Sequence, residues 1–390
     1  MQTPQNRCKH PIIWLSTAHL INDTYTGFLN PIMPFLAAKL GFSMAIATVV
    51  MSIAHICASL LQPLFGFFAD NILKRFFIFW GLLLVSIFIP LAPLASNVYI
   101  LAICVILGSL GSSFFHPQSS GFVVRFSQKN YSENMAYFIS AGSLGFSFGP
   151  MIAGIVTQYF GLTAITYLSF IGIITALLMF SCVPKISLTD NPPVHKDFIP
   201  AFKKILSNSK ILILILLSVM KSIMTNSCFI LLPFLWKNVG YSAGRIGFYL
   251  FSFIFFGAIG SLVSDKLEHK IGAKKVFYIS LMTMLPMTYF FVQALDKSVF
   301  IYYPIFIVMG FLTMLAMPVN VVMAQKIMPE YKSILAGFVN GFSWGISAIL
   351  LTGVGVLAEK FGIKEVLVCV SVLPFLSAFF VRFLPDKISE

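Results

Sequence analysis

The sequence has little charge. Only 10% of its 390 residues are Asp, Glu, Lys or Arg, against about 25% in an average soluble domain, whereas 58% are hydrophobic. Acidic residues are especially scarce, with 13 against 26 basic residues, so the net charge is +13. This composition excludes an ordinary soluble domain and predicts a chain that lies in a lipid bilayer.

The sequence also lacks arrangements typical of catalysis or metal binding. Its six cysteines show no metal-ligand spacing and fall mostly within apolar segments, as small buried residues do. Two matches to the Gly-x-Ser-x-Gly nucleophile pattern, at 145–149 and 341–345, lie inside apolar segments of helical length. That pattern needs a strand before the serine, and no acid or histidine is placed to complete a triad. We therefore expect no enzyme activity, no cofactor and no bound metal.

What the sequence has in abundance is long apolar segments. A membrane-spanning helix needs about 20 mostly apolar residues, and the charge clusters, prolines and Gly/Asn turns divide the chain into twelve such segments. We predict an all-α membrane protein whose spans lie near 12–37, 43–69, 76–95, 98–124, 132–157, 162–183, 210–235, 243–264, 276–295, 299–325, 332–357 and 363–384.

The basic residues predict the orientation of these spans. Lys and Arg are retained on the cytoplasmic side in short loops. Most of the 26 basic residues fall in cytoplasmic segments if both termini are inside. Because these residues are spread over many separate loops, we interpret the positive charge as a topology signal that also suits an anionic inner leaflet, and we expect no nucleic-acid partner. The expected location is the cytoplasmic (inner) membrane of a bacterium.

The two halves of the chain repeat each other. Pro34-Phe-Leu matches Pro233-Phe-Leu at a shift of 199 residues, and His116-Pro117 matches Met317-Pro318 at a shift of 201. The polar stretch between the halves predicts an N-terminal six-helix bundle at 1–184, a cytoplasmic linker at 185–209 and a C-terminal six-helix bundle at 210–390. Duplicated bundles are typical of transporters that alternate access around a site between the repeats.

The loop after the second predicted span carries a family motif. Gly66-Phe-Phe-Ala-Asp70 with Lys74-Arg75 resembles the motif between helices two and three of the major facilitator superfamily, and Ser264-Asp265-Lys266 resembles its second copy. The resemblance implies twelve transmembrane helices in two pseudo-symmetric six-helix bundles. It also implies a gate, because a carboxylate in this loop can cap a neighbouring helix in one conformation only. The expected gating residues are Gly66, Asp70, Lys74, Arg75 and Asp265.

The fifth predicted span carries a second motif. Gly145, Gly149, Pro150 and Gly154 are similar to the helix-five motif of antiporters in that superfamily. Small residues at this spacing are also common where membrane helices pack closely. Both interpretations remain open from the sequence.

A narrower resemblance covers nearly the whole chain. His19-Leu-Ile-Asn22-Asp23 and the run Gly111–Ser120 around His116-Pro117 look like the fosmidomycin resistance protein family of drug exporters. Gln118 stands where that family usually has a glutamate. The resemblance implies drug or metabolite efflux.

Polar residues follow one face of several predicted spans. His19, Asn22, Asp23 and Thr26 have helical spacing in the first span, and the second and fourth spans carry similar stripes. Ionisable side chains inside a membrane are costly and usually functional, although a structural ion pair or a histidine bonded across helices is the simpler alternative. We expect proton coupling and a substrate cavity at His19, Asn22, Asp23, Thr26, His55, Gln62, His116, Gln118, Lys221 and Asn226.

These patterns lead to one functional expectation. We predict a monomeric, proton-coupled antiporter that exports a small anionic or amphiphilic compound. In this hypothesis Asp23 and Lys221 neutralise each other until a proton or an anionic substrate competes. The alternative is a proton-coupled importer of an anionic metabolite or siderophore with the same fold.

Overall fold

The structure is a computed structural model that is almost entirely helical, and no strand occurs among the residues that it describes. Helices suit this sequence because an α-helix satisfies its own backbone hydrogen bonds, which the bilayer cannot do. The described residues are 11–62, 64–65, 76–127, 131–183 and 198–385.

The predicted spans are almost entirely helical wherever the structure describes them, and the second, 43–69, is described only in part. Ten helices are long and apolar enough to cross a membrane among the described residues. The first predicted span is a pair, α1 (Pro11–Gly27) and α2 (Leu29–Leu40), separated at Phe28. The second begins as α3 (Met44–His55) and continues as a short π-helix, η2 (Ile56–Leu60).

The remaining helices of the first half follow the predicted order. They are α5 (Phe76–Leu91) with η3 (Ala92–Leu94), α6 (Val98–Phe126), α7 (Tyr131–Phe160), and η4 (Leu162–Leu168) with α8 (Ser169–Cys182).

The linker holds a helix that the sequence analysis did not predict, α9 (Phe198–Leu206). The second half then consists of α10 (Ser209–Asn238), α11 (Ala243–Ile271), α12 (Ala273–Met282), α13 (Met284–Leu295), α14 (Val299–Leu315), α15 (Met317–Ile327), η6 (Pro329–Tyr331), α16 (Lys332–Gly337), η7 (Phe338–Phe342), α17 (Ser343–Phe361), α18 (Ile363–Ser377) and η8 (Ala378–Phe383).

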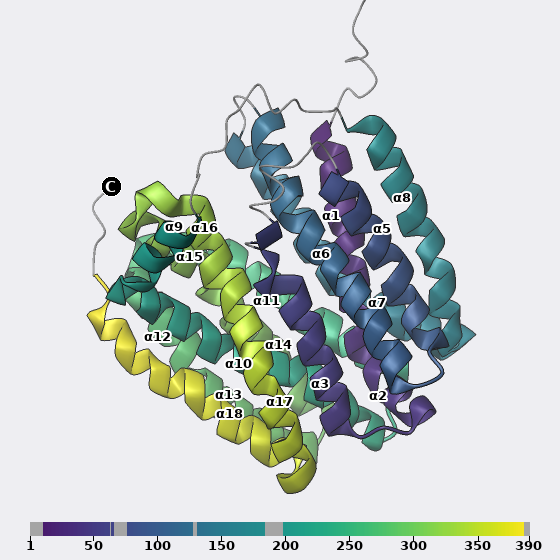
Figure 1. The fold of residues 1–390 in the computed structure, drawn as a ribbon. Coiled ribbons are helices and arrows are strands. Elements are labelled where there is room, and N and C mark those ends of the chain that lie inside the picture. The colour runs from purple at the N-terminus through teal and green to yellow at the C-terminus, as the bar shows by residue number, and fades with distance from the viewer. Residues whose placement is uncertain (1–10, 63, 66–75, 128–130, 184–197, 386–390) are drawn as a thin grey trace, which may run out of the picture. The chain divides into compact units, whose positions relative to one another are not determined.

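The chain forms two compact units. Unit 1 comprises Met1–Gly41, Cys57–Lys196 and Ser242–Phe248, and unit 2 comprises Phe42–Ile56, Asp197–Tyr241 and Tyr249–Glu390. In unit 1, α1 packs along α7, and α5 packs between α6 and α8 (Figure 1). In unit 2, α10 packs against α17 and α18, and α3 lies beside α17.

Glycines bring the helices of unit 1 into close contact. A methyl group added at Gly145 would collide with the backbone carbonyl of Leu20, and one at Gly149 with that of Thr24. The backbones of α7 and α1 therefore touch directly, as small residues permit in membrane helices. This close packing fixes the polar face of α1 against α7.

Candidate functional site

The polar residues of the first predicted span are buried on one side of α1. His19 is 8% exposed and Asn22 is fully buried, and the side chain of Asp23 is 16% exposed. The partners of these side chains come from α7 and α6, both in unit 1. The site is thus built by three helices of one unit.

His19 is held by the backbone of α7. Its Nδ1 lies 2.8 Å from the carbonyl oxygen of Phe138, and because a carbonyl can only accept, Nδ1 must carry a hydrogen. The imidazole also stacks on the Phe138 ring, with centroids 4.1 Å apart. Gly142, one turn along α7, leaves room for this ring, since a methyl group there would collide with Cε1 and Nε2 of His19.

The other nitrogen of His19 faces a carboxylate. Nε2 lies 3.2 Å from Oδ2 of Asp23, four residues along the same helix. With Nδ1 protonated, a neutral imidazole would set the Nε2 lone pair against an ionised carboxylate, which is repulsive. The contact therefore requires a proton on Nε2 or on Asp23. The geometry thus sets an imidazole nitrogen and a carboxylate oxygen where they can share a proton.

His116 on α6 approaches the same carboxylate from the other side. Its Nε2 lies 3.4 Å from Oδ1 of Asp23 and 3.4 Å from Nδ2 of Asn22. Asn22 donates to Oδ1 of Asp23 at 2.8 Å and to Oγ of Ser112 at 3.3 Å. The predicted polar stripes of the first and fourth spans therefore meet at Asp23.

The ligand atoms of His19, Asp23 and His116 all lie within 4.8 Å of one another, the one such group among the described residues. This spacing is short enough to hold a metal ion, and it equally suits a shared proton. The expectation of no metal stays a prediction.

Three other predicted site residues in unit 1 bond to backbone atoms. Thr26 donates to the carbonyl of Asp23 at 2.8 Å, and Gln62 donates to the carbonyl of Ala58 at 2.7 Å. Gln118 accepts from the backbone N–H of Ile78 at 2.9 Å, near the beginning of α5. Thr26 thus lies beside the cluster, whereas Gln118 joins α6 to α5.

The remaining predicted site residues belong to unit 2. His55 lies beside Trp344, with ring centroids 6.1 Å apart, and its buried Nε2 has no hydrogen-bond partner among the described residues. Asn226 is fully buried and donates to Oγ of Ser347 at 2.9 Å. Neither His55 nor Asn226 lines the cavity beside Lys221, which is described next.

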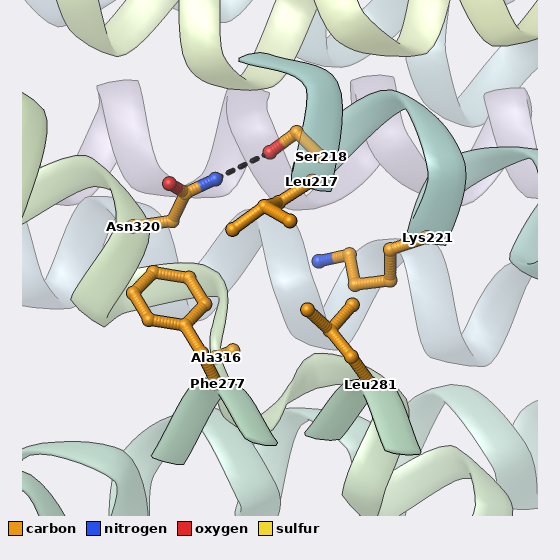
Figure 2. A pocket seen from close by; sticks show the side chains of 7 residues that line it. All are labelled: Leu217, Ser218, Lys221, Phe277, Leu281, Ala316 and Asn320. Carbon is orange, nitrogen blue, oxygen red and sulfur yellow. Dashed lines mark hydrogen bonds between the residues drawn. The ribbon is translucent and has the colours of Figure 1, made fainter. Parts of the chain in front are cut away.

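Lys221 lies on α10 and is only 6% exposed. Figure 2 shows its ammonium group entering a small cavity between Leu217 and Leu281. No hydrogen bond or ion pair of Nζ occurs within the described part of unit 2. Since Asp23 belongs to unit 1, the predicted Asp23–Lys221 pair stays a prediction. The full cavity lining is Leu217, Ser218, Lys221, Phe277, Leu281, Ala316 and Asn320.

The predicted gating residues Gly66, Asp70, Lys74 and Arg75 lie outside the described residues. Asp265 is described, on α11. Its side chain is 77% exposed and lies 3.9 Å from His269, one turn further along the helix.

The glycines of the antiporter-like motif pack against two helices. Gly145 and Gly149 face α1, whereas Gly154 faces the beginning of α11, where a methyl group would collide with the carbonyl of Ala243. A methyl group at Gly247 of α11 would likewise meet the carbonyl of Pro150. These contacts explain why small residues stand here, and the antiporter role stays a prediction.

Some residues of the site were missed by the sequence analysis. The Phe138 carbonyl could not be inferred, because a backbone acceptor leaves no mark in the residue type. Gly142 had a signal, since it precedes Gly145 by three residues and extends the same glycine face of α7. Ser218 and Asn320 gave no signal in the sequence other than being polar residues in apolar spans.

Comparisons with known proteins agree with this architecture. The family model of the Major Facilitator Superfamily matches residues 15–352. The Fosmidomycin resistance protein of Escherichia coli (strain K12) is 24% identical, over 96% of this chain and 92% of that protein. The Sialic acid transporter NanX of the same strain is 28% identical over a shorter stretch, 38% of this chain and 36% of that protein.

Solved structures of distant sequence share the fold. A bacterial homolog of the human lysosomal transporter Spinster has a TM-score of 0.82 at 12% identity, and 98% of each chain is covered. The nucleoside transporter NupG has a TM-score of 0.79 at 13% identity, over 96% of this chain and 99% of that one. At such low identity the likeness concerns the fold alone.

Proposed function

The chain belongs to the major facilitator superfamily of membrane transporters, and from that premise we propose that it is a proton-coupled antiporter that exports a small anionic or amphiphilic compound. The observation that carries this proposal is the contact between His19 and Asp23. This pair needs one exchangeable proton, and it is buried in a span.

The His19–Asp23 pair supplies the proton step. A proton from outside neutralises the pair, and the same proton leaves to the cytoplasm when the carrier changes conformation. His116, at 3.4 Å from the carboxylate, is placed to pass this proton or to contact the substrate. Because His19 is anchored through Nδ1, the proton is exchanged on the Nε2 side.

Lys221 supports an anionic substrate. It is a buried cation on α10 beside a cavity, and an anionic group is its natural partner. Phenylalanines, 42 in the chain, supply apolar walls for the rest of an amphiphilic compound.

Export is supported by the name of the relative that is 24% identical, a resistance protein, together with the antiporter-like glycines of α7.

We place both termini in the cytoplasm of a bacterium and divide the chain into bundles at 1–184 and 210–390, joined by the linker at 185–209. In the same proposal Asp70, Lys74 and Arg75 form a gating latch.

Transport in proteoliposomes under an imposed pH gradient tests the proposal. An antiporter exchanges protons for substrate, so an acidic lumen should drive accumulation of an anionic compound. A symporter, which is the importer alternative, should accumulate the same compound only with an alkaline lumen. The sign of the effect does not depend on the orientation of the protein in the vesicle. Accumulation that ignores the gradient across a panel of anionic, neutral and cationic compounds would contradict proton coupling.

A further inference from the structure

Two neighbouring helices of unit 2 leave a groove between them. α12 lies beside α18 and η8, which continue one another (Figure 1). The groove has a volume of about 340 Å³, which is room for roughly ten methylene groups if each takes about the 30 Å³ of a water molecule. Tyr278 and Met282 line it from α12, and Phe375, Leu376, Phe379 and Arg382 line it from α18 and η8.

The groove lies on a surface that the bilayer covers. Leu376 and Phe379 are 60% and 54% exposed, and both sides of the groove belong to segments long and apolar enough to cross a membrane. From Phe375 to Arg382 the lining follows about two turns of helix, or roughly 11 Å. An apolar channel therefore leads along the span to a charged end, which is the direction in which a lipid acyl chain lies.

Arg382 marks the charged end of the groove. Its guanidinium lies over the rings of Phe379 and Phe383, at 3.5 Å and 4.5 Å from their centroids, and this stacking holds the cation at the rim. No carboxylate pairs with it in the part of the chain that the structure describes. Lys274, in the first turn of α12, brings a second cation, since its Nζ donates to the backbone carbonyl of Arg382 at 3.2 Å.

We propose that the groove between α12 and α18 binds an anionic phospholipid, with an acyl chain along the apolar lining and the phosphate at Arg382 and Lys274. The phosphate oxygens accept hydrogen bonds from the guanidinium and the ammonium. A zwitterionic lipid has the same phosphate, but its own cationic group is repelled by the two protein cations. Basic residues in a cleft between membrane helices are a known arrangement for anionic headgroups. A lipid bound in this way joins α12 to α18.

Photoactivatable lipids provide a direct test. The full chain is placed in phosphatidylcholine nanodiscs that contain a small amount of either phosphatidylglycerol or phosphatidylcholine with a diazirine in the acyl chain. Peptide mass spectrometry measures the label on α12 and α18 relative to α8, which carries no charged residue and reports ordinary lipid contacts. We expect phosphatidylglycerol to be enriched at the groove roughly tenfold over phosphatidylcholine.

Two substitutions test the headgroup contacts. Arg382→Gln and Lys274→Gln should each lower this enrichment about threefold, and the double variant should show almost none. Lys360→Gln is the matched control, because Lys360 also lies over a ring, that of Phe361 at 5.1 Å, but does not line the groove. It should keep the enrichment of the wild type.

A larger side chain tests the place of the acyl chain. In Leu376→Trp the indole should occupy the groove, so labelling of α12 and α18 by phosphatidylglycerol should fall to the level of phosphatidylcholine. Leu373→Trp is the control, because Leu373 is exposed on the same helix but does not line the groove.

Equal labelling of the groove by the two lipids in the wild type would overturn the proposal, and so would a preference that survives the removal of both cations. Loss of the preference on addition of glycerol 3-phosphate at constant ionic strength would also overturn it, because a free headgroup would then occupy the site. Neither proton coupling nor the direction of transport enters these measurements.

Discussion

The two ring nitrogens of His19 have unequal roles. Nδ1 donates its hydrogen to a backbone carbonyl, which accepts the hydrogen bond but does not take up the proton. Nε2 faces the carboxylate of Asp23. This arrangement fixes the tautomer, as hydrogen bonds to the second nitrogen commonly do. Residues that hold the ring in place should therefore matter for coupling although they carry no proton.

Gly142 is the clearest of these positioning residues. In Gly142→Ala the new methyl group would collide with the His19 ring, so the ring must leave its place between Phe138 and Asp23. Because small misplacements of a reacting group are costly, we expect proton-driven transport to fall roughly tenfold to a hundredfold. Transport in proteoliposomes with an acidic lumen measures the effect.

Gly353→Ala is the matched control, since no atom lies within 4 Å of a methyl group there. It should transport at the wild-type rate. Wild-type coupling in Gly142→Ala would show that the position of the His19 ring does not matter.

At the scale of elements, the contact between α1 and α7 decides how the site is assembled. In Gly149→Ala the new methyl group would meet the Thr24 carbonyl and the Cα of Gly27, so the two helices must move apart. Overpacking of this kind costs about 1–3 kcal/mol. We expect a lower melting temperature together with a proportionate loss of transport, whereas Gly353→Ala should be as stable as the wild type or slightly more so.

This substitution also separates the two interpretations of the glycine motif. If Gly149→Ala keeps its stability and its substrate exchange but loses proton coupling, the motif has an antiporter-specific role. If stability, exchange and coupling are all unchanged, the close packing of α1 on α7 is not important.

The sequence predicted most of the helices because hydropathy and helical length decide where a span can lie. It did not predict the π-helices η2 and η7, which interrupt the second and eleventh spans. A π-helix changes the hydrogen-bonding register over a few residues, and such a short change does not alter the apolar pattern. The linker helix α9 was missed because it is short and carries two lysines in its last turn.

At the scale of the whole molecule, the two repeats carry different chemistry at matching positions. The shift of 199 residues places Ser218 at the position of His19 and Lys221 at that of Asn22. The first repeat thus has an acid with two histidines, and the second has a buried cation with neutral donors. We interpret this difference as a division of roles, with protons in unit 1 and the anion in unit 2.

Much of this site could be predicted from the residues alone. The ionisable groups of α1 and α6 were identified because charge in a membrane is rare, and their stripes showed which faces would meet. The contact between His19 Nδ1 and the Phe138 carbonyl could not be predicted, since it depends on a backbone atom and on how the ring is turned. The Ser218–Asn320 contact joins residues 102 positions apart, and one sequence gives no information on such a distance.

The orientation of the chain in the membrane is directly testable. Single cysteines introduced into a variant without native cysteines should react with a membrane-impermeant reagent in the linker at 185–209 only after the cells are opened. Cysteines in the predicted outside turns, for example at Asn97, should react in intact cells. Labelling of the linker from outside would invert the topology and with it the direction of proton movement.

In the proposed function Asp23, together with His19, carries the coupling proton. Asp23→Asn keeps the size of the side chain and removes its ability to ionise, so the measurement that tests the claim most directly is transport by this variant in proteoliposomes, with and without a pH gradient. We predict that Asp23→Asn still exchanges substrate across the membrane at equal pH but no longer accumulates it when the lumen is acidic. Accumulation at the wild-type rate would contradict the account, because the proton would then have to be carried elsewhere.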